Sequence, residues 1–362
     1  MNPGDAFPEL AAAWLRDGRE WSEAEFERRA LELYAYQVER NEAYARFAAS
    51  LGFSKARAPQ SWRTIPAVPS SAFKDATLTT FPARDAELVF HTSGTTAGRA
   101  GKHYVQRAAL YDASLLAAFD RFMLTDRPRL RFLNLVPNPR FNPHSSLGYM
   151  LGHAGVLRGE GPPAYFLDGD ALDVAGFSAA LETACAQNRA VLIATTAFAL
   201  ATLLDTLEAQ GRAFAAPAGS RVMETGGFKG RAKVVAREEL YARAAAALGI
   251  AQSAIVAEYG MTELLSQFYD TPASRGTAVR VKAGPPWLGT LVVDAAGNEV
   301  SPGTTGFLRH VDLANVSSVL AIDTEDRGYA VDGGFVLLGR DLDAPPRGCS
   351  LDAEELRARV AS

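Results

Sequence analysis

Cysteine is nearly absent from this chain of 362 residues, which contains only Cys185 and Cys349. Two thiols cannot form a disulfide framework, and neither has a second Cys or a His at metal-ligand spacing. The sequence therefore predicts a reducing, cytoplasmic setting and no zinc site. Cys185 falls within an apolar helical stretch, residues 177–190, and is predicted to be a core thiol.

The sequence also lacks a membrane-spanning run and a large excess of either charge. Its most apolar run, residues 190–204, is interrupted by threonines and falls short of the roughly 18 to 20 residues that cross a bilayer. The first residues are acidic and turn-like, so no export signal is expected. With 37 Lys and Arg against 41 Asp and Glu, the formal net charge of −4 argues against a general surface for nucleic acid.

Strand and helix patterns alternate through the middle of the chain. Hydrophobic residues make up 48% of the sequence, enough to bury a large core. Such alternation is typical of an α/β fold with a mostly parallel, helix-covered sheet. The predicted strands are residues 86–90, 131–136, 190–194, 221–224 and 253–257, and the predicted helices are 21–50, 108–123, 147–155, the segment after Thr196, and 231–248.

The pattern changes after Glu263, where short strands are separated by Gly, Pro and Asp turns. These strands, at residues 290–293, 305–311, 316–323 and 335–338, predict a β-rich subdomain, either a distorted barrel or a second sheet. The predicted division is 1–85 as an N-terminal helical and Pro-rich segment, 86–265 as an α/β core, 266–340 as the β-rich subdomain, and 341–362 as a short C-terminal arm.

The first chemical signal is the loop of residues 91–102, HTSGTTAGRAGK, which follows a predicted strand. Such a loop lets backbone N–H groups approach an anion, and hydroxyl and cationic side chains add hydrogen bonds to phosphate oxygens. It is not a Walker A loop, because Thr96 stands where that pattern needs a glycine. The sequence predicts a phosphate-binding loop with Lys102 or Arg99 as its cation; the alternative is a surface turn rich in small residues.

Four further motifs follow in order: residues 224–228 (ETGGF), 258–263 (EYGMTE), 323–329 (DTEDRGY) and 339–341 (GRD). Together with the loop they resemble the signatures of the adenylate-forming superfamily of acyl-CoA ligases, peptide-synthetase adenylation domains and luciferases. One departure is Thr324-Glu325-Asp326, where the usual pattern is Thr-Gly-Asp. The resemblance implies the fold of the N-terminal domain of these enzymes.

The resemblance also implies ATP and Mg²⁺ as cofactors. In these enzymes a carboxylate attacks the α-phosphate of ATP to give an acyl-adenylate, and donors plus a divalent cation reduce the repulsion between the two anions. Thr262 would then bind the α-phosphate, Glu263 would bind Mg²⁺, and Lys102 would be the catalytic cation. The remaining implied nucleotide-binding residues are Thr92, Ser93, Gly94, Thr95, Thr96 and Gly98 in the loop, Gly226, Gly227, Tyr259 and Gly260 around the adenine, and Asp326 with Arg340 at the ribose.

The acid is expected near the turn at Thr196 and Phe198 and near His144, which are the candidate substrate-binding residues. A structural histidine is the alternative at His144. His91 opens the phosphate loop and could line the adenylate carbonyl. The other histidines, His103, His153 and His310, show no metal spacing and are predicted to be structural.

The segment after Arg340 narrows the resemblance. Superfamily members that transfer the acyl group to CoA or a carrier have a large C-terminal domain there with a catalytic lysine, and this domain is not expected here. Cys349 instead follows Arg347 and precedes a predicted helix, features that lower a thiol pKa and increase its nucleophilicity. With residues 66–73 (PAVPSSAF) and 144–150 (HSSLGYM), this arrangement resembles the LuxE family of acyl-protein synthetases, in which a cysteine of a short C-terminal arm accepts the fatty acyl group.

The sequence therefore predicts an ATP-dependent acid–thiol ligase that converts a fatty or other carboxylic acid to acyl-AMP and transfers the acyl group to Cys349. The family implies delivery to an acyl reductase partner. Two alternatives stay open: an acid:CoA or acid:carrier ligase in which Cys349 is incidental, and a non-catalytic adenylate-binding protein. Thr262, Glu263 and Asp326 argue against the second alternative.

Overall fold

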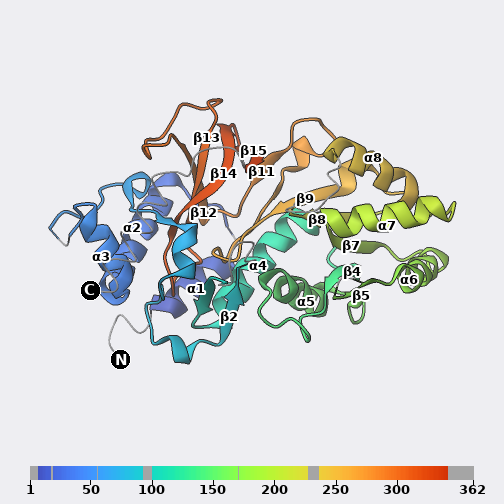
Figure 1. Ribbon diagram of the computed structural model, residues 1–362, viewed down its shortest axis with the longest axis horizontal. Coiled ribbons are helices and arrows are strands. Elements are labelled where there is room, and N and C mark those ends of the chain that lie inside the picture. Colours follow the sequence, from blue (N-terminus) through green and yellow to red (C-terminus); the bar gives the residue numbers. More distant parts are fainter. Residues whose placement is uncertain are drawn as a thin grey trace. The chain divides into compact units, whose positions relative to one another are not determined.

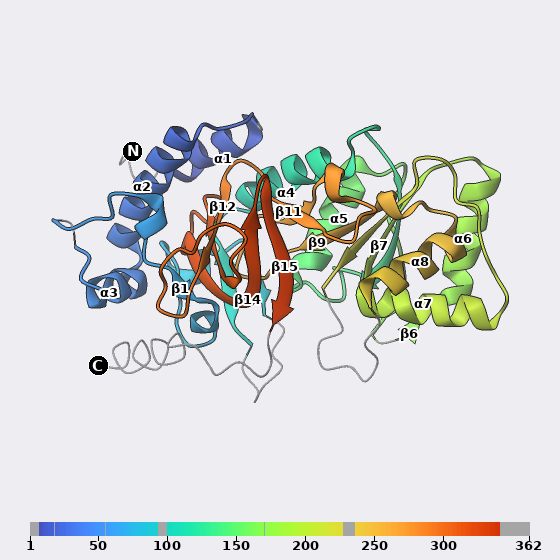
Figure 2. The same ribbon diagram turned by 90° about the horizontal axis from the view of Figure 1, so that it is seen from above.

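The computed structural model describes residues 7–17, 19–54, 56–92, 100–169, 171–226 and 236–340. The chain divides into two compact units, shown in two views in Figures 1 and 2. Unit 1 contains Met1–Ala117, Met261–Gln267 and Val281–Ser362, and unit 2 contains Ala118–Gly260 and Phe268–Arg280. The EYGMTE motif therefore passes from unit 2 to unit 1 between Gly260 and Met261.

Unit 2 is built on a mostly parallel sheet with the strand order β10-β9-β8-β7-β4-β5-β6. The five inner strands run parallel, and β10 and β6 pair antiparallel at the two ends of this order. The inner strands are short apolar runs, as expected for strands covered on both faces. The bounds are β4 Arg131–Pro137, β5 Ala164–Asp168, β6 Ala171–Leu172, β7 Val191–Thr196, β8 Arg221–Thr225, β9 Ile255–Tyr259 and β10 Phe268–Asp270.

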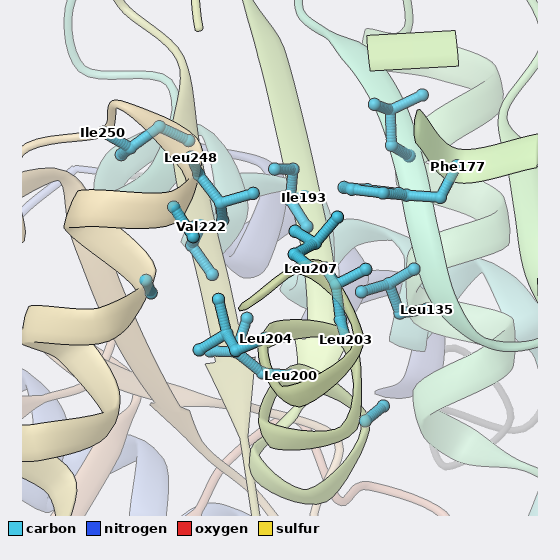
Figure 3. Close-up of a cluster of buried hydrophobic side chains, with 14 of the residues drawn as sticks. Leu135, Phe177, Ile193, Leu200, Leu203, Leu204, Leu207, Val222, Leu248 and Ile250 are labelled. Atoms are coloured by element: carbon cyan, nitrogen blue, oxygen red, sulfur yellow. The ribbon is translucent and has the colours of Figure 1, made fainter. Parts of the chain in front are cut away.

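Helices cover both faces of this sheet. One face carries α6 (Val174–Ala186), α7 (Ala197–Ala209) and α8 (Arg237–Leu248), whose apolar side chains form one buried cluster with the strands. Figure 3 shows the α7 leucines beside Ile193 and Val222, which are register partners and so point to the same face. The opposite face carries α5 (Ser146–Arg158) and the end of α4, where Phe119 stacks on Phe132 of β4.

Unit 1 contains an antiparallel sheet in the order β12-β13-β14-β15-β11, with β1 parallel to β14. It also contains the β2–β3 hairpin, which carries the predicted phosphate loop. The strands are β1 Val68–Pro69, β2 Leu88–His91, β3 Lys102–Val105, β11 Val281–Ala283, β12 Leu288–Val293, β13 Gly306–Asp312, β14 Ala321–Val331 and β15 Gly334–Arg340. The helices are α1 Phe7–Asp17, α2 Glu23–Arg40, α3 Glu42–Ser50 and the first part of α4 (Ala108–Met123).

The structure confirms the predicted α/β class and corrects several elements. The expected helix 21–50 is two helices, because Asn41 ends α2 with an N–H bond to Gln37 and caps α3 by accepting the N–H of Tyr44. The expected strand 316–323 begins only at Ala321, because turns at Asn315 and Ser318 precede it. The four-part division of the chain stays a prediction. No helix in the described ranges is both long and apolar enough to cross a bilayer.

Candidate active site

The β2–β3 hairpin of unit 1 closes the base of the predicted phosphate loop. The N–H of Thr92 donates to the carbonyl of Gly101 at 2.9 Å, and the N–H of Gly101 donates to Oγ1 of Thr92 at 2.8 Å. Lys102, the first residue of β3, is exposed and accessible to an anion. The loop residues Ser93, Gly94, Thr95, Thr96, Gly98 and Arg99 lie outside the described part of the chain.

The Pro-rich segment of residues 66–73 supports this hairpin. Its residue Val68 pairs with Ile322 of β14, four residues before Asp326. The ring of Phe73 meets His103 of β3 edge-on, with ring centroids 5.6 Å apart. A Cβ at Gly101 would lie only 3.0 Å from the main chain of Phe73, so glycine permits this close approach. The segment therefore connects the hairpin to the sheet.

Thr262 contacts both strands of the same hairpin. Its carbonyl oxygen lies 2.7 Å from Nδ1 of His103 in β3, and its Oγ1 donates to the carbonyl of His91 in β2 at 3.4 Å. The next residue, Glu263, is buried, and its carbonyl accepts from Nδ2 of Asn315 at 2.7 Å. The structure therefore brings Thr262 and Glu263 to the base of the predicted phosphate loop.

A buried polar network holds the rest of the segment 261–267. The carboxylate of Asp312 accepts from the N–H of Leu265 at 2.9 Å and from Oγ of Ser266 at 2.7 Å. Oγ of Ser266 in turn accepts from the indole of Trp287 at 3.1 Å. Burial raises the pKa of Asp312 to about 6. These bonds fix the segment that follows Glu263 in the sequence.

Buried titratable groups make the stability of unit 1 depend on pH. Burial lowers the pKa of His103 and of His310 to about 4, whereas it raises that of Asp312. The contribution of the two histidines to the free energy of unfolding is complete above pH 6.5 and is lost as pH falls towards 4. The contribution of Asp312 has the opposite sign and increases as pH falls from 6 towards 3.8. We expect a free energy of unfolding about 2 kcal/mol lower at pH 5 than at pH 7, because two histidines outweigh one carboxyl group.

Urea unfolding of the full chain at these two pH values measures this difference. His310→Gln removes one of the two histidine contributions and is expected to reduce the difference below about 1 kcal/mol. A free energy of unfolding that is higher at pH 5, or a difference unchanged by His310→Gln, would contradict this account.

Asp326 and Arg340 lie side by side as cross-strand partners of β14 and β15. Nε of Arg340 donates to Oδ1 of Asp326 at 3.1 Å, and its Nη1 lies 3.5 Å from the carboxylate of Glu325. The N–H of Asp326 donates to Oγ1 of Thr324 at 3.2 Å. Although Glu325 replaces the usual glycine, Asp326 therefore still lies beside Arg340, its predicted partner at the ribose.

The unit 2 candidates gather at the carboxyl edge of its parallel strands. Thr196, Thr225 and Glu258 are register partners at the ends of β7, β8 and β9, and Tyr259 follows at once. Gly226 leaves β8 with a positive φ of 76°, a conformation that favours glycine. In open parallel sheets this edge is the usual site of ligand binding.

Some of these unit 2 side chains also make contacts within the protein. Oγ1 of Thr196 caps α7 by accepting the N–H of Ala199 at 3.2 Å, so this predicted substrate residue also has a structural task. The Tyr259 ring stacks on Phe268 with centroids 5.8 Å apart. Phe198 lies in the first turn of α7, His144 is exposed in the loop between β4 and α5, Gly260 is exposed after β9, and Gly227 lies outside the described residues.

Several polar residues of these regions were not predicted from the sequence. In unit 2 the hydroxyl of Thr225 donates to the carboxylate of Glu258, and the hydroxyl of Tyr241 donates to Glu224 at 2.9 Å. In unit 1 His103 and Asn315 hold the segment with Thr262 and Glu263. The alternation in β3, which buries His103 and exposes Lys102, was the one signal available for His103.

The two cysteines differ in what the structure records of them. Cys185 is partly buried against the core cluster, and its Sγ lies 3.5 Å from the carbonyl of Ala215. Burial raises the pKa of its thiol, which lowers its reactivity at neutral pH. Cys349 lies outside the described residues.

The acidic residues fit Mg²⁺ better than a metal held by the protein alone. Within the described ranges, no group of three or more His, Cys, Asp or Glu side chains is placed to hold a metal ion. Mg²⁺ retains several waters and is commonly bound by one or two carboxylates together with substrate phosphates. Glu263, whose main chain is held by Asn315, could supply a carboxylate of this kind.

The fold is that of the N-terminal domain of adenylate-forming enzymes. A 2-hydroxyisobutyryl-CoA ligase in its postadenylation state matches with a TM-score of 0.66 and 15% identity, over 92% of this chain and 72% of that chain. ATP-bound MatB from Rhodopseudomonas palustris matches with a TM-score of 0.51 and 18% identity, over 72% and 49%. This chain thus covers about half the length of that protein, and the predicted fold is confirmed.

Within this class the chain belongs to one family. The family model "Acyl-protein synthetase, LuxE" matches residues 14–350, which confirms the resemblance predicted from the motifs. No curated protein matches the chain. The matched range contains the phosphate loop, the EYGMTE motif, Asp326 with Arg340, and Cys349. The chain is therefore a member of the LuxE acyl-protein synthetase family and has the fold of adenylate-forming enzymes.

Proposed function

We propose that this protein activates a fatty or related carboxylic acid as acyl-AMP and then transfers the acyl group to its own Cys349. The observation that carries this proposal is the family match over residues 14–350, because it includes both the adenylation motifs and the cysteine. The acyl-enzyme would then deliver its acyl group to a partner such as an acyl reductase. A reducing, cytoplasmic setting suits a protein whose acceptor is a free thiol.

In the first step the unit 1 residues would act on the triphosphate. The closed β2–β3 hairpin would present the loop N–H groups and Lys102 to the β- and γ-phosphates. Thr262 would donate to the α-phosphate, and Glu263 would hold Mg²⁺, which supplies positive charge against the phosphates when bound. Asp326 would accept from the ribose hydroxyls beside Arg340.

The carboxyl edge of the unit 2 sheet would hold the rest of the substrates. Tyr259 with Gly226, Gly227 and Gly260 would contact the adenine, and His144, Thr196 and Phe198 would contact the acid. His144 is exposed rather than buried, so its side chain is accessible to a substrate. An aromatic side chain beside glycines suits stacking on a flat heteroaromatic base.

The second step would be acyl transfer to sulfur. The Cys349 thiol would lose its proton to solvent, and the thiolate would attack the carbonyl carbon of acyl-AMP. A C–S bond would form while the C–O bond to AMP breaks, and AMP would leave with the electron pair. The product would be a thioester, which keeps the acyl group activated for a later transfer.

The test combines two measurements on the full chain. Pyrophosphate exchange into ATP is measured with saturated acids of increasing length and with benzoate, with and without EDTA. Labelled acid and ATP are then incubated with the protein, with and without CoA, and the protein is assayed for label that hydroxylamine releases. We expect exchange that needs Mg²⁺ and label that stays on the protein. Label only in a free CoA ester would support the CoA ligase alternative, and no exchange with any acid would support the non-catalytic one.

Asp326→Asn tests the proposed ribose contact. Loss of the charge weakens an acceptor that a ribose hydroxyl and Arg340 would share, so we expect KM for ATP to rise about tenfold with kcat changed less than about threefold. Pyrophosphate exchange at varied ATP measures both constants. Glu325→Gln is the matched control, because it alters the neighbouring exposed carboxylate. An equal rise of KM in both variants would contradict the assignment.

A further inference from the structure

We propose that His103 is a positioning residue that holds Thr262 and Glu263 against the phosphate hairpin and thereby sets the geometry of acid adenylation. This inference rests on the proposed function. His103 and Thr262 are 159 residues apart in the sequence. Their contact joins β3 of the phosphate hairpin to the EYGMTE motif, in addition to the bond from Thr262 to His91.

The direction of the His103 hydrogen bond follows from its partner. Nδ1 lies 2.7 Å from the carbonyl oxygen of Thr262, and a carbonyl oxygen can only accept. Nδ1 therefore carries the proton, and Nε2 carries the lone pair of the neutral ring. Burial lowers the pKa of His103 to about 4, so the ring stays neutral at physiological pH.

The contact works with a second one to fix Thr262 between two strands. Oγ1 of Thr262 donates to the carbonyl of His91, and His91 pairs with Lys102, the neighbour of His103. The carbonyl of Glu263 is held separately by Asn315. Thr262 therefore cannot shift relative to either strand of the hairpin without losing a hydrogen bond.

The surroundings of Nε2 indicate that the Nδ1 bond to Thr262 explains why position 103 is a histidine. Nε2 is buried and has no hydrogen-bond partner among the described residues, and the Phe73 ring packs edge-on against the imidazole. An unsatisfied buried acceptor costs about 1–3 kcal/mol. An apolar side chain at position 103 would avoid that cost, so the ring contributes through its Nδ1 bond to Thr262.

Three variants separate this role from general stability. His103→Leu removes the Nδ1–H donor, whereas His103→Asn places an amide N–H close to the position of Nδ1. His310→Leu is the matched control, because His310 is equally buried in unit 1 and its Nδ1 lies 3.0 Å from Oγ1 of Thr290 on the neighbouring strand. If His103→Leu does not fold, His103→Gln replaces it. The Gln side chain is polar, but its amide lies one bond further from the main chain than Nδ1 and so is not placed to donate to Thr262.

The first measurement is hydrogen exchange of the peptide spanning residues 261–267, without substrate. We expect about tenfold faster exchange in His103→Leu and near wild-type exchange in His103→Asn and His310→Leu. Equal exchange in all variants would overturn the proposed contact. This measurement stands whether or not the protein adenylates an acid.

The second measurement is pyrophosphate exchange with the best acid. A displaced Thr262 would weaken groups needed in the transition state, so we expect kcat of His103→Leu to fall about 30-fold with KM for ATP changed less than about threefold. Asn at this position is expected to restore most of kcat. Equal kcat in His103→Leu and His310→Leu would overturn the positioning role. Absence of pyrophosphate exchange in the wild type would instead count against the proposed function itself.

Discussion

Replacing Glu263 with Gln is expected to reduce kcat for pyrophosphate exchange by about 100- to 1000-fold, the usual cost of removing one electrostatic contact from a transition state. The substitution keeps the size of the side chain and removes the charge that would hold Mg²⁺ beside the phosphates. The main chain of Glu263 remains bound to Asn315, so the fold is expected to persist. Exchange kinetics at saturating ATP, together with the thermal midpoint, separate the two effects.

The matched control for this substitution is Glu42→Gln. Glu42 begins α3 in the same unit, and its exposed carboxylate pairs only with Arg46 among the ion pairs of the described residues. The same loss of one negative charge at that position is expected to leave kcat within about twofold, because exposed pairs contribute little. A wild-type rate of pyrophosphate exchange in Glu263→Gln would show that Glu263 does not bind the metal.

The fold was predictable where local patterns decide the structure. Helix α4 has the predicted bounds, because an apolar helical pattern fills residues 108–123. Thr196 ends one element and caps the next, so a strand followed by a helix could be read directly. Asn41 was missed because the same residue that breaks one helix begins another without an intervening loop.

Short strands were missed for a different reason. β3, β10 and β11 have three or four residues each, and each is a strand only because another segment pairs with it. β11, for example, pairs with β15 through Val281 and Val336. Such pairing is decided by tertiary contacts rather than by the propensity of three residues.

The candidate site shows the same division between local and distant information. The motifs identified Thr262, Glu263, Asp326 and Arg340, and the structure brings the first two to the phosphate hairpin and joins the last two. The side chains that hold them could not be read from the sequence. His103 was predicted to be structural because it shows no metal-ligand spacing, and no spacing rule connects it with Thr262, which lies 159 residues away.

Substitution of Cys349 separates the two chemical steps. Cys349→Ala is expected to abolish covalent acylation while leaving pyrophosphate exchange within about twofold, because adenylation is complete before sulfur attacks the carbonyl. Cys185→Ala is the matched control and is expected to keep the label, since burial raises the pKa of that thiol. The measurement is the label recovered on protein before and after hydroxylamine. Label that survives in Cys349→Ala, or exchange lost together with it, would show that acid activation and acyl transfer are not divided in this way.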